Sequence, residues 1–445
     1  MALDWIAAIA VLTRRPAGFT PLLPNAARRS IALLILAALA SAILAAQPLW
    51  ALVEVALGLG SLGLAWWVAQ QRRAHGTAAD ALLLAALCFV CAGLVVRFTA
   101  AYAAAVFGGA GVLDAWLLVD GFSNPRFYGQ FLTLALPLLA APWLAAGRLA
   151  RWRWGALGLL VLVWTAAITS GTRGTWLGLA CAAALLLWLG PLARRWVALQ
   201  LGAAAAGVAL FGLLLKLIPA WLGLAVANDA AGRMTTSLSG REAIWHQAWE
   251  AALAHPMLGI GPMQLASLPN GVAAHPHQAW LQWAAELGLP SALGVTGLVL
   301  WAGVALLRQV RAASRAEVDV LRLCLAAAVT ASLAQSMVDG VLVMPYSQLW
   351  LAVVAGWLLG LPRPGAAPVS SAAVSRWVVG AWLTAFGASV ALLGFVALRD
   401  APRLALRQQA FAQTLGGHLQ PRFWTQGSIA PEVETALARL RGGGE

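Results

Sequence analysis

The sequence predicts an all-α membrane protein, a polytopic bundle of about 11–12 transmembrane helices with a helical cap formed by one long loop. Hydrophobic residues make up 61% of the 445 residues and only 10% are charged, whereas a soluble domain carries roughly 25% charged residues. Apolar runs of about 18 residues or more recur along the chain, which is close to the length that a helix needs to cross a bilayer. Short arginine clusters separate these runs. The lipid bilayer is therefore an expected partner.

The net charge of +13 does not indicate a nucleic-acid partner. Lys216 is the only lysine, and most of the arginines lie between apolar runs, where the positive-inside rule assigns them to the cytoplasmic face. The four cysteines all fall within apolar runs, and the Cys88-x-x-Cys91 pair among them indicates helix packing rather than redox chemistry.

The alternation of apolar runs and arginine clusters predicts eleven spans. Their approximate ranges are 31–47, 50–69, 80–105, 127–146, 154–170, 174–190, 197–219, 289–307, 321–338, 347–361 and 377–397. A twelfth span follows if residues 99–120 cross the membrane separately, or if the apolar patch Trp5–Leu12 enters it. Eleven spans leave the C-terminal tail outside and twelve leave it inside, and Arg399, Arg403 and Arg407 mildly favour the inside.

These spans divide the chain into five regions. They are a cytoplasmic N-terminal segment (1–30), an N-terminal transmembrane bundle (31–219), a large outer loop with the functional helices (220–288), a C-terminal transmembrane bundle (289–397) and a soluble tail (398–445).

The most polar part of the outer loop, from Ser239 to Gly288, holds four of the six histidines. Its S-x-x-E pattern from Ser239 to Glu242 is that of a capping box and predicts a helix that runs to about Ala254. The following His255-Pro256 pair should end this helix. Arg241 then lies in the first helical turn, where free backbone N–H groups already attract anions, so we expect a phosphate-binding site there.

A second helix is predicted to start at His275-Pro276-His277, with Pro276 as its first helical residue, and to stop at Gly288. His277 would then lie in the first turn, where the helix N-terminus disfavours the imidazolium form. A neutral histidine near pH 7 is what a general base requires. His275 is either a second polar contact or only a cap.

Positive charge gathers on the outer face, against the positive-inside rule. The residues predicted there are Arg97, Arg126, Arg173, Lys216 and Arg241, and such a set suits an anionic headgroup at the membrane interface. Arg97 lies within a predicted span, so it is either paired or functional, or it extends to the interface. The few acids nearby are Glu242, Glu286, Asp120 and Asp339.

Several signatures do not occur in the sequence: a Walker A motif, an outer-face D-x-D and a zinc motif. The first absence argues against ATP-driven transport by this chain. The others leave positive side chains to do what a metal would do at an anionic group, and no cofactor is expected.

Three segments resemble the O-antigen ligase and O-antigen polymerase superfamily. The polar loop reads GRxxxWxxAWxxxxxHPxxGIGPxxL and then HPHQxWLQxxxELG, and the ligase pattern H-[NSQ]-x9-G is met by His277, Gln278 and Gly288. The segments FSNPRFYGQFL (Phe122–Leu132) and SGTRGTWLGL (Ser170–Leu179) are also similar to segments of this superfamily. The resemblance covers about residues 80–360 in the same order.

The resemblance implies a metal-independent glycosyltransferase of the bacterial inner membrane that works at the periplasmic face. Its donor would be an undecaprenyl-pyrophosphate-linked glycan, and in the ligases the acceptor is a sugar hydroxyl of lipid A–core. His277 would be the base that activates this hydroxyl, while Arg173 and Arg241 would bind the pyrophosphate. Further substrate-binding candidates are Arg126, Lys216, Arg97, His275, Gln278 and Tyr128. Direct attack by the acceptor would invert the anomeric carbon.

Other functions remain open at this point. An O-antigen polymerase or a protein O-oligosaccharyltransferase would use the same donor chemistry with a different acceptor. A transporter or flippase of lipid-linked glycan belongs to another class, in which sites at mid-membrane and internal repeats are common. The polar residues here gather at the outer interface, which favours the enzyme. The effect of His277→Ala on transfer and on lipid binding separates these possibilities.

Overall fold

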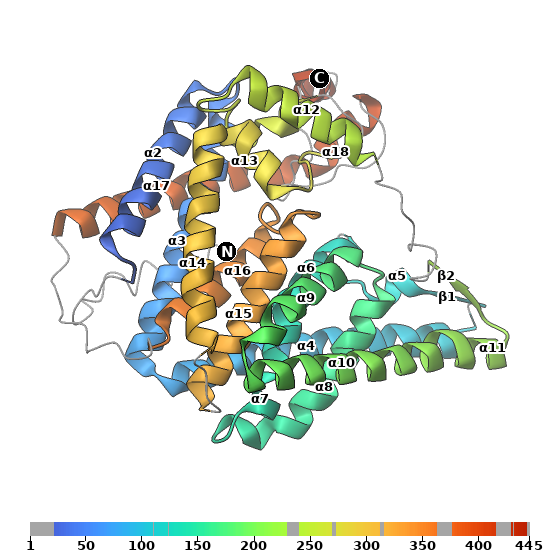
Figure 1. The fold of residues 1–445 in the computed structure, drawn as a ribbon. Helices are drawn as coiled ribbons and strands as arrows, with labels where there is room; N and C mark the ends of the chain where they lie inside the picture. Colours follow the sequence, from blue (N-terminus) through green and yellow to red (C-terminus); the bar gives the residue numbers. More distant parts are fainter. Residues whose placement is uncertain are drawn as a thin grey trace.

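The computed structural model describes residues 22–109, 111–122, 124–228, 240–268, 273–311, 316–362, 376–414, 429 and 431–442. Helices form nearly all of this part of the chain, as Figure 1 shows, so the predicted all-α class is confirmed. Eight helical segments of the described chain are long and apolar enough to cross a membrane.

Every predicted span falls on a helix. The helices are α2 (Asn25–Leu44), α3 (Pro48–His75), α4 (Thr77–Phe107), α6 (Pro125–Leu139) with α7 (Ala141–Leu144), α8 (Arg153–Thr169), α9 (Arg173–Leu186), α10 (Pro191–Gly212), α14 (Leu289–Arg311), α15 (Glu317–Ser336), α16 (Pro345–Gly360) and α17 (Arg376–Asp400). The three predicted spans absent from the eight long apolar segments are α9, α15 and α16. Most residues of α15 are buried, since it packs against α6, α9 and α16 in the centre of the bundle (Figure 1).

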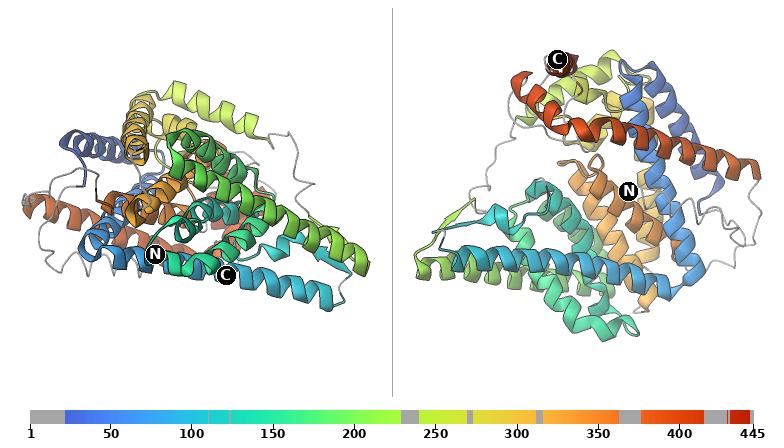
Figure 2. Two further views of the ribbon diagram at one scale, coloured as in Figure 1. Left: turned by 60° about the horizontal axis from the view of Figure 1, so that its bottom comes forward. Right: turned by 180° about the vertical axis from the view of Figure 1, so that it is seen from behind.

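The alternative of a separate span at residues 99–120 is not supported. Helix α4 continues without a break to Phe107, and the chain then forms strand β1 (Val112–Asp114) and the short helix α5 (Ala115–Leu118). Strand β1 pairs in parallel with β2 (Ala225–Ala227), which follows α11 (Ile218–Leu222) at the far end of α10. Helices α4 and α10 both extend to this strand pair (Figures 1 and 2). The patch Trp5–Leu12 lies outside the described residues.

The cap consists of α12 (Arg241–Ala254) and α13 (Ala279–Leu287), which lie together at one end of the bundle (Figure 1). Alanine side chains allow these helices to approach closely: Ala248 and Ala252 of α12 pack with Ala284 and Ala285 of α13. The Ser41 hydroxyl of α2 donates to two backbone carbonyls of the cap. One is that of Leu258, which follows α12, at 2.6 Å, and the other is that of Glu286 in α13, at 3.0 Å.

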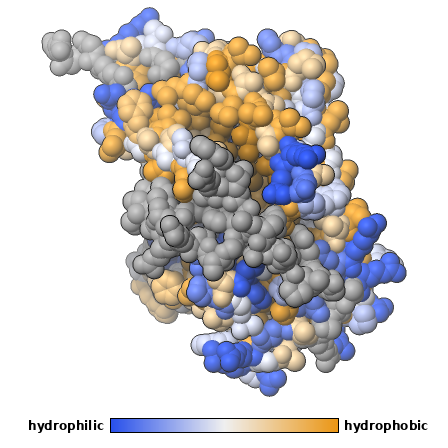
Figure 3. All heavy atoms as spheres, turned by 90° about the vertical axis from the view of Figure 1, so that its left-hand side faces the viewer, coloured by the Kyte–Doolittle hydropathy of each residue, from blue (hydrophilic) through white to orange (hydrophobic). Residues whose placement is uncertain are grey.

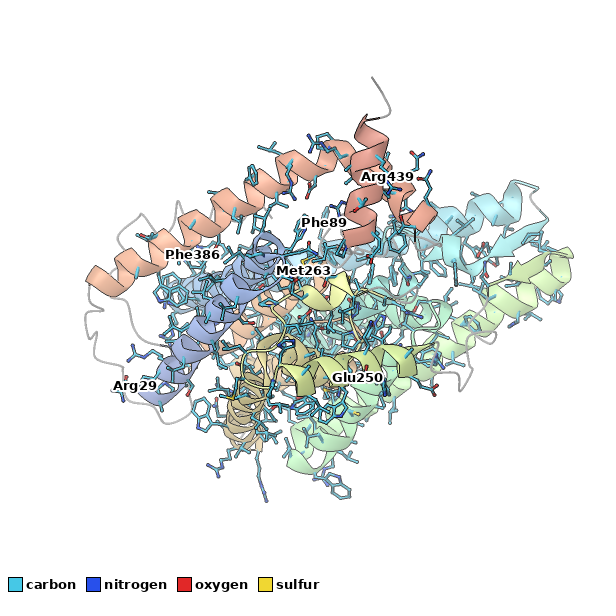
Figure 4. All side chains as sticks on the ribbon, turned by 90° about the horizontal axis from the view of Figure 1, so that it is seen from above. Arg29, Phe89, Glu250, Met263, Phe386 and Arg439 are labelled. Atoms are coloured by element: carbon cyan, nitrogen blue, oxygen red, sulfur yellow. The ribbon has the colours of Figure 1, made fainter. Side chains whose placement is uncertain are left out.

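The C-terminal tail lies on the same side of the molecule as the cap. Its helices α18 (Leu404–Thr414) and α19 (Pro431–Gly442) form a hairpin. The Ile429 N–H donates to the carbonyl of Ala266 at 2.9 Å, and the Ile429 carbonyl accepts from the Gln47 side chain at 2.7 Å. Viewed from above, Met263 lies between α12 and the C-terminal helices (Figure 4).

These contacts place the tail beside the cap, and the mild preference for an inside tail, inferred from its arginines, stays a prediction. The guanidinium groups of Arg399 and Arg407 lie over the ring of Trp50, at 4.8 and 5.6 Å from its centroid. These cation–π contacts attach the start of the tail to α3.

The outer surface of the bundle suits a lipid environment. Exposed large apolar side chains include Leu33 and Leu36 of α2 and Phe395 of α17. On the face that carries α2 and α17, apolar residues cover a broad area of the upper half, and polar residues lie along its edges and over the lower part (Figure 3).

Candidate active site

The first helix of the cap forms where the sequence predicts it. Helix α12 begins at Arg241 and ends at Ala254, with His255 as the C-cap. The residue before the helix is Gly240, which has a left-handed backbone (φ 76°). Ser239 of the predicted capping box lies outside the described residues.

The second cap helix begins later than the prediction of a start at His275-Pro276. Helix α13 starts at Ala279, and its N-cap is Gln278, whose side chain accepts a hydrogen bond from the Leu281 N–H. Pro276 is not the first helical residue, because His277 has a left-handed backbone (φ 53°) that a right-handed helix does not contain. The predicted stop at Gly288 is confirmed.

His277 lies just before α13 and is buried, with 7% of its surface exposed. The ring of His277 contacts the ring of His275 at a centroid distance of 4.1 Å. The backbone N–H of His277 donates to Nδ1 of His275 at 3.2 Å. The Nδ1 atom of His277 is 3.8 Å from Oδ1 of Asp339, and among the described residues it has no hydrogen-bond partner. A buried imidazole thus faces a buried carboxylate at ion-pair distance.

Asp339 is held in place by three bundle helices. It lies in the turn between α15 and α16, and its carboxylate accepts from Gln130 Nε2 of α6 and Gln335 Nε2 of α15, both at 3.1 Å. The N–H of Gly340 donates to Oδ1 at 2.7 Å. The Ser347 hydroxyl of α16 in turn holds the Gln130 carbonyl oxygen at 3.1 Å. This network fixes the carboxylate against His277.

Sequence reasoning noted Asp339 only as one of a few acids near the outer face and did not pair it with His277. The available signal was its place in an Asp-Gly turn directly after the predicted span 321–338. Asp339 and His277 are 62 positions apart in the sequence, so no local sequence pattern indicates that they pair.

Burial and neighbouring charges determine the protonation of this pair. Burial lowers the pKa of His277 below its ordinary value of 6.5; Asp339 acts in the opposite direction, and the positive charges of Arg126 and Arg241 lower the pKa further. Burial alone would raise the pKa of Asp339, but His277, the Gly340 N–H and Arg126 hold it below its ordinary value. The site therefore holds a neutral imidazole beside an ionised carboxylate at pH 7.

Three arginines, each at the start of a helix, lie in the same region: Arg126 and Arg241 act electrostatically on His277, and Arg173 acts on Arg241. Arg126 lies in the first turn of α6, Arg173 is the first residue of α9, and Arg241 is the first residue of α12. Burial lowers the pKa of Arg241, and the positive charges of Arg126 and Arg173 lower it as well, so the three lie close enough to interact electrostatically. Within the described residues, neither Arg126 nor Arg241 forms an ion pair of 4.0 Å or less. Their charge, together with the helix N-termini, suits a bound anion.

The remaining predicted site residues are used elsewhere. Lys216 lies in a π-helical turn between α10 and α11, at the end that carries the β1–β2 pair (Figure 1). Arg97 pairs with Asp120 at 2.8 Å on the surface, so the structure supports the paired interpretation of this residue. Tyr128 is 1% exposed and packs in the core against Phe122. Gln278 caps α13.

Two glutamates that the sequence places near the site have other positions. Glu286 is buried, and its carboxylate accepts from the Leu265 N–H and from Gln282 Nε2, both at 3.3 Å, which ties α13 to the loop before it. Glu242 lies in the first turn of α12. In the part of the chain that the structure describes, no group of three or more His, Cys, Asp or Glu side chains is arranged to hold a metal ion.

Comparison with known proteins assigns the family. Residues 158–302 match the sequence model of the family described as O-antigen ligase, a segment that extends from α8 into α14 and includes Arg173, Arg241 and His277. A search of curated proteins found no match. The matched segment, the all-helical bundle and the apolar spans agree, and they support membership of this chain in the O-antigen ligase family of membrane proteins, whose activity is of the glycosyltransferase type.

Proposed function

We propose that this protein is an O-antigen ligase that transfers a glycan from undecaprenyl pyrophosphate to a sugar hydroxyl of lipid A–core, at the periplasmic face of the bacterial inner membrane. The observation that carries the proposal is the juxtaposition of a neutral, buried His277 with Asp339 and with the positive charges of Arg126 and Arg241. Transfer of a glycosyl group from a pyrophosphate to a hydroxyl needs a base for the hydroxyl and positive charge for the pyrophosphate, and these residues supply both.

In this mechanism His277 is the general base. Asp339 lies on the Nδ1 side of its ring, so the proton belongs on Nδ1 and the Nε2 lone pair is available to the substrate. The distance of 3.8 Å is longer than a hydrogen bond, and such distances often shorten when substrate binds. The acceptor hydroxyl transfers its proton to Nε2 as its oxygen attacks the anomeric carbon.

The arginines stabilise the leaving group. As the acceptor oxygen bonds to the anomeric carbon, the bond from that carbon to the pyrophosphate oxygen breaks, and the electron pair stays on the lipid pyrophosphate. Arg126, Arg173 and Arg241 supply positive charge for this anion, aided by the N-termini of their helices. The leaving group then needs no proton, and a single displacement inverts the anomeric configuration.

The test is transfer by the purified protein. It would receive undecaprenyl-pyrophosphate glycan and rough lipopolysaccharide in the presence of chelator, and lipopolysaccharide of higher mass would be measured. His277→Gln should lower the turnover number ~10²–10⁴-fold, the usual contribution of a general base. His246→Gln is the matched control, because His246 is an exposed histidine on α12 that pairs with Glu250; this variant should act like wild type.

Other outcomes would identify other functions. Longer lipid-linked glycan without modified lipopolysaccharide would mean a polymerase, and transfer to a peptide would mean a protein O-oligosaccharyltransferase. Binding of the donor lipid without transfer to any acceptor would contradict the enzyme and support a transporter. Retention of the anomeric configuration in the product would exclude the single displacement.

A further inference from the structure

The backbone of His277 is in a conformation that is uncommon for a residue other than glycine. Its φ of 53° is in the left-handed region, which residues with a Cβ rarely adopt. Such a conformation persists only where the surroundings hold it, and it is found most often at functional positions. Three contacts hold residues 275–277 in place: one within the segment, one from α12 and one with Gly340.

The nearest contact comes from His275. Its Nδ1 accepts the N–H of His277 at 3.2 Å, which closes a turn from a side chain to the backbone two residues on. Asn and Asp make the same turn with a side-chain oxygen. His275 is 5% exposed, so no bulk water competes for this bond.

Two further contacts hold the loop from opposite sides. The Trp245 indole N–H of α12 donates to the carbonyl of Pro276 at 2.8 Å. On the bundle side, the ring of His275 lies directly against Gly340, where an added Cβ would be 2.5 Å from its Cε1 and 2.9 Å from its Nε2. Gly340 is also the residue whose N–H binds Asp339.

We infer that His275 is a positioning residue: it fixes the left-handed backbone of His277 and so sets the direction in which the His277 imidazole points relative to Asp339. This assignment rests on the proposed function of His277 as the base. It differs from the substrate-binding role expected from the sequence, because the Nδ1 of His275 is engaged by the backbone. Gly340 completes the arrangement, since only a residue without a side chain leaves room for the His275 ring.

Two substitutions of His275 that differ in whether they keep a hydrogen-bond acceptor for the His277 N–H should have different effects. In His275→Asn the side-chain oxygen takes the place of Nδ1 and the turn is kept, so the turnover number should stay within about threefold of wild type. His275→Leu has similar bulk without an acceptor, and the turnover number should fall on the order of 10²-fold, as expected when a catalytic group is misplaced by about 1 Å. The KM for the lipid donor should hardly change, because the arginines are untouched.

A double substitution tests the contact with Gly340 in both directions. Gly340→Ala alone places a methyl group against the Cε1 and Nε2 atoms of His275 and should lower turnover. Asparagine has neither atom, so His275→Asn combined with Gly340→Ala should be more active than Gly340→Ala alone. A residue needed only for folding would make the double variant worse than either single one. His246→Asn and His246→Leu are the matched controls on an exposed histidine.

The results separate this inference from the proposed function. Equal loss in His275→Asn and His275→Leu would mean that the imidazole itself is required, and full activity in both would mean that the turn is not; either result overturns the inference. If wild type transfers nothing, the proposed function fails, and hydrogen–deuterium exchange of the peptide containing His277 still tests the role of His275. Exchange should be faster in His275→Leu and unchanged in His275→Asn.

Discussion

Opposing charges act on a single residue, His277. Asp339 favours its protonated form, whereas burial, Arg126 and Arg241 favour the neutral form. The net effect is a pKa below the ordinary value. Since the base must be neutral, activity should be fully present at pH 7 and be lost as the pH falls through a value below 6.5.

Removing a negative neighbour and removing a positive neighbour of His277 should shift the acid limb of the pH–rate profile, where activity is lost at low pH, in opposite directions. Asp339→Asn removes the negative charge that stabilises the imidazolium, so the pKa of His277 falls and the limb moves to lower pH, while the plateau rate drops. Arg241→Gln removes a positive charge, so the pKa rises and the limb moves to higher pH. Rates of transfer at saturating donor between about pH 4 and 8 measure both shifts. Limbs that move together would refute this electrostatic account.

At the same scale, the sequence predicted the arginines but not the carboxylate. Arginines that the span pattern assigns to the outer face stand out because they depart from the positive-inside rule, and the charges of two of them, Arg126 and Arg173, act on a third, Arg241. Asp339 gave no such signal, because its role depends on Gln130 and Gln335 from two other helices. Burial of Tyr128 likewise depends on packing against other helices, so its position in a motif could not reveal that its side chain lies in the core.

Among the elements, α13 begins just after His277, and two backbone hydrogen bonds from the loop before it set the position of this helix. The Ile260 N–H donates to the Ala285 carbonyl at 2.9 Å, and the Gly261 N–H donates to the Glu286 carbonyl at 3.1 Å. This approach requires Gly259, where an added Cβ would be 2.3 Å from the backbone carbon of Glu286.

Gly259→Ala should therefore destabilise the cap. The left-handed φ of 69° alone costs about 1–2 kcal/mol for a residue with a Cβ, and the overlap with the backbone adds to this. Thermal unfolding of the protein in detergent, together with the transfer rate, measures the effect. Gly297→Ala in α14 is the control, because an added Cβ meets nothing within 4 Å and alanine favours a helix. Equal melting temperatures in the two variants would contradict the prediction.

Helix boundaries were predictable where local chemistry determines them. The His255-Pro256 pair ended α12 as expected, and Gly288 ended α13. The start of α13 was not predictable, because Pro276 suits a first helical position. The left-handed backbone of His277 depends on the side chain of His275 together with the long-range contact from Trp245 to Pro276.

At the scale of the whole molecule, the cap, the site and the C-terminal tail share one side. Residue 429 contacts Ala266 of the loop between α12 and α13, and the turn Leu149–Trp152 lies at the opposite end of the bundle (Figure 1). The sequence predicted the spans but left the side of the tail open, because the contacts that decide it join residues far apart in the chain.

Single cysteines can test this arrangement. In a chain whose four cysteines are replaced by serine or alanine, Glu250→Cys on α12 and Arg439→Cys on α19 should react with a membrane-impermeant maleimide from the same side. Arg151→Cys, in the turn at the other end, should react only from the opposite side. Intact and permeabilised cells give the two conditions. Labelling of Arg439→Cys under the conditions that label Arg151→Cys would put the tail on the other face.

The burial of His277 has a consequence for the competition between acceptors. A glycosyl pyrophosphate can be consumed by hydrolysis as well as by transfer, and water is far more abundant than any sugar hydroxyl. His277, the proposed base, is 7% exposed and would activate little bulk solvent, so an acceptor that fills the space beside the ring would be favoured over water. Burial of the imidazole would then limit hydrolysis of the donor until the acceptor binds. The choice between water and the acceptor would be made without a separate proofreading step.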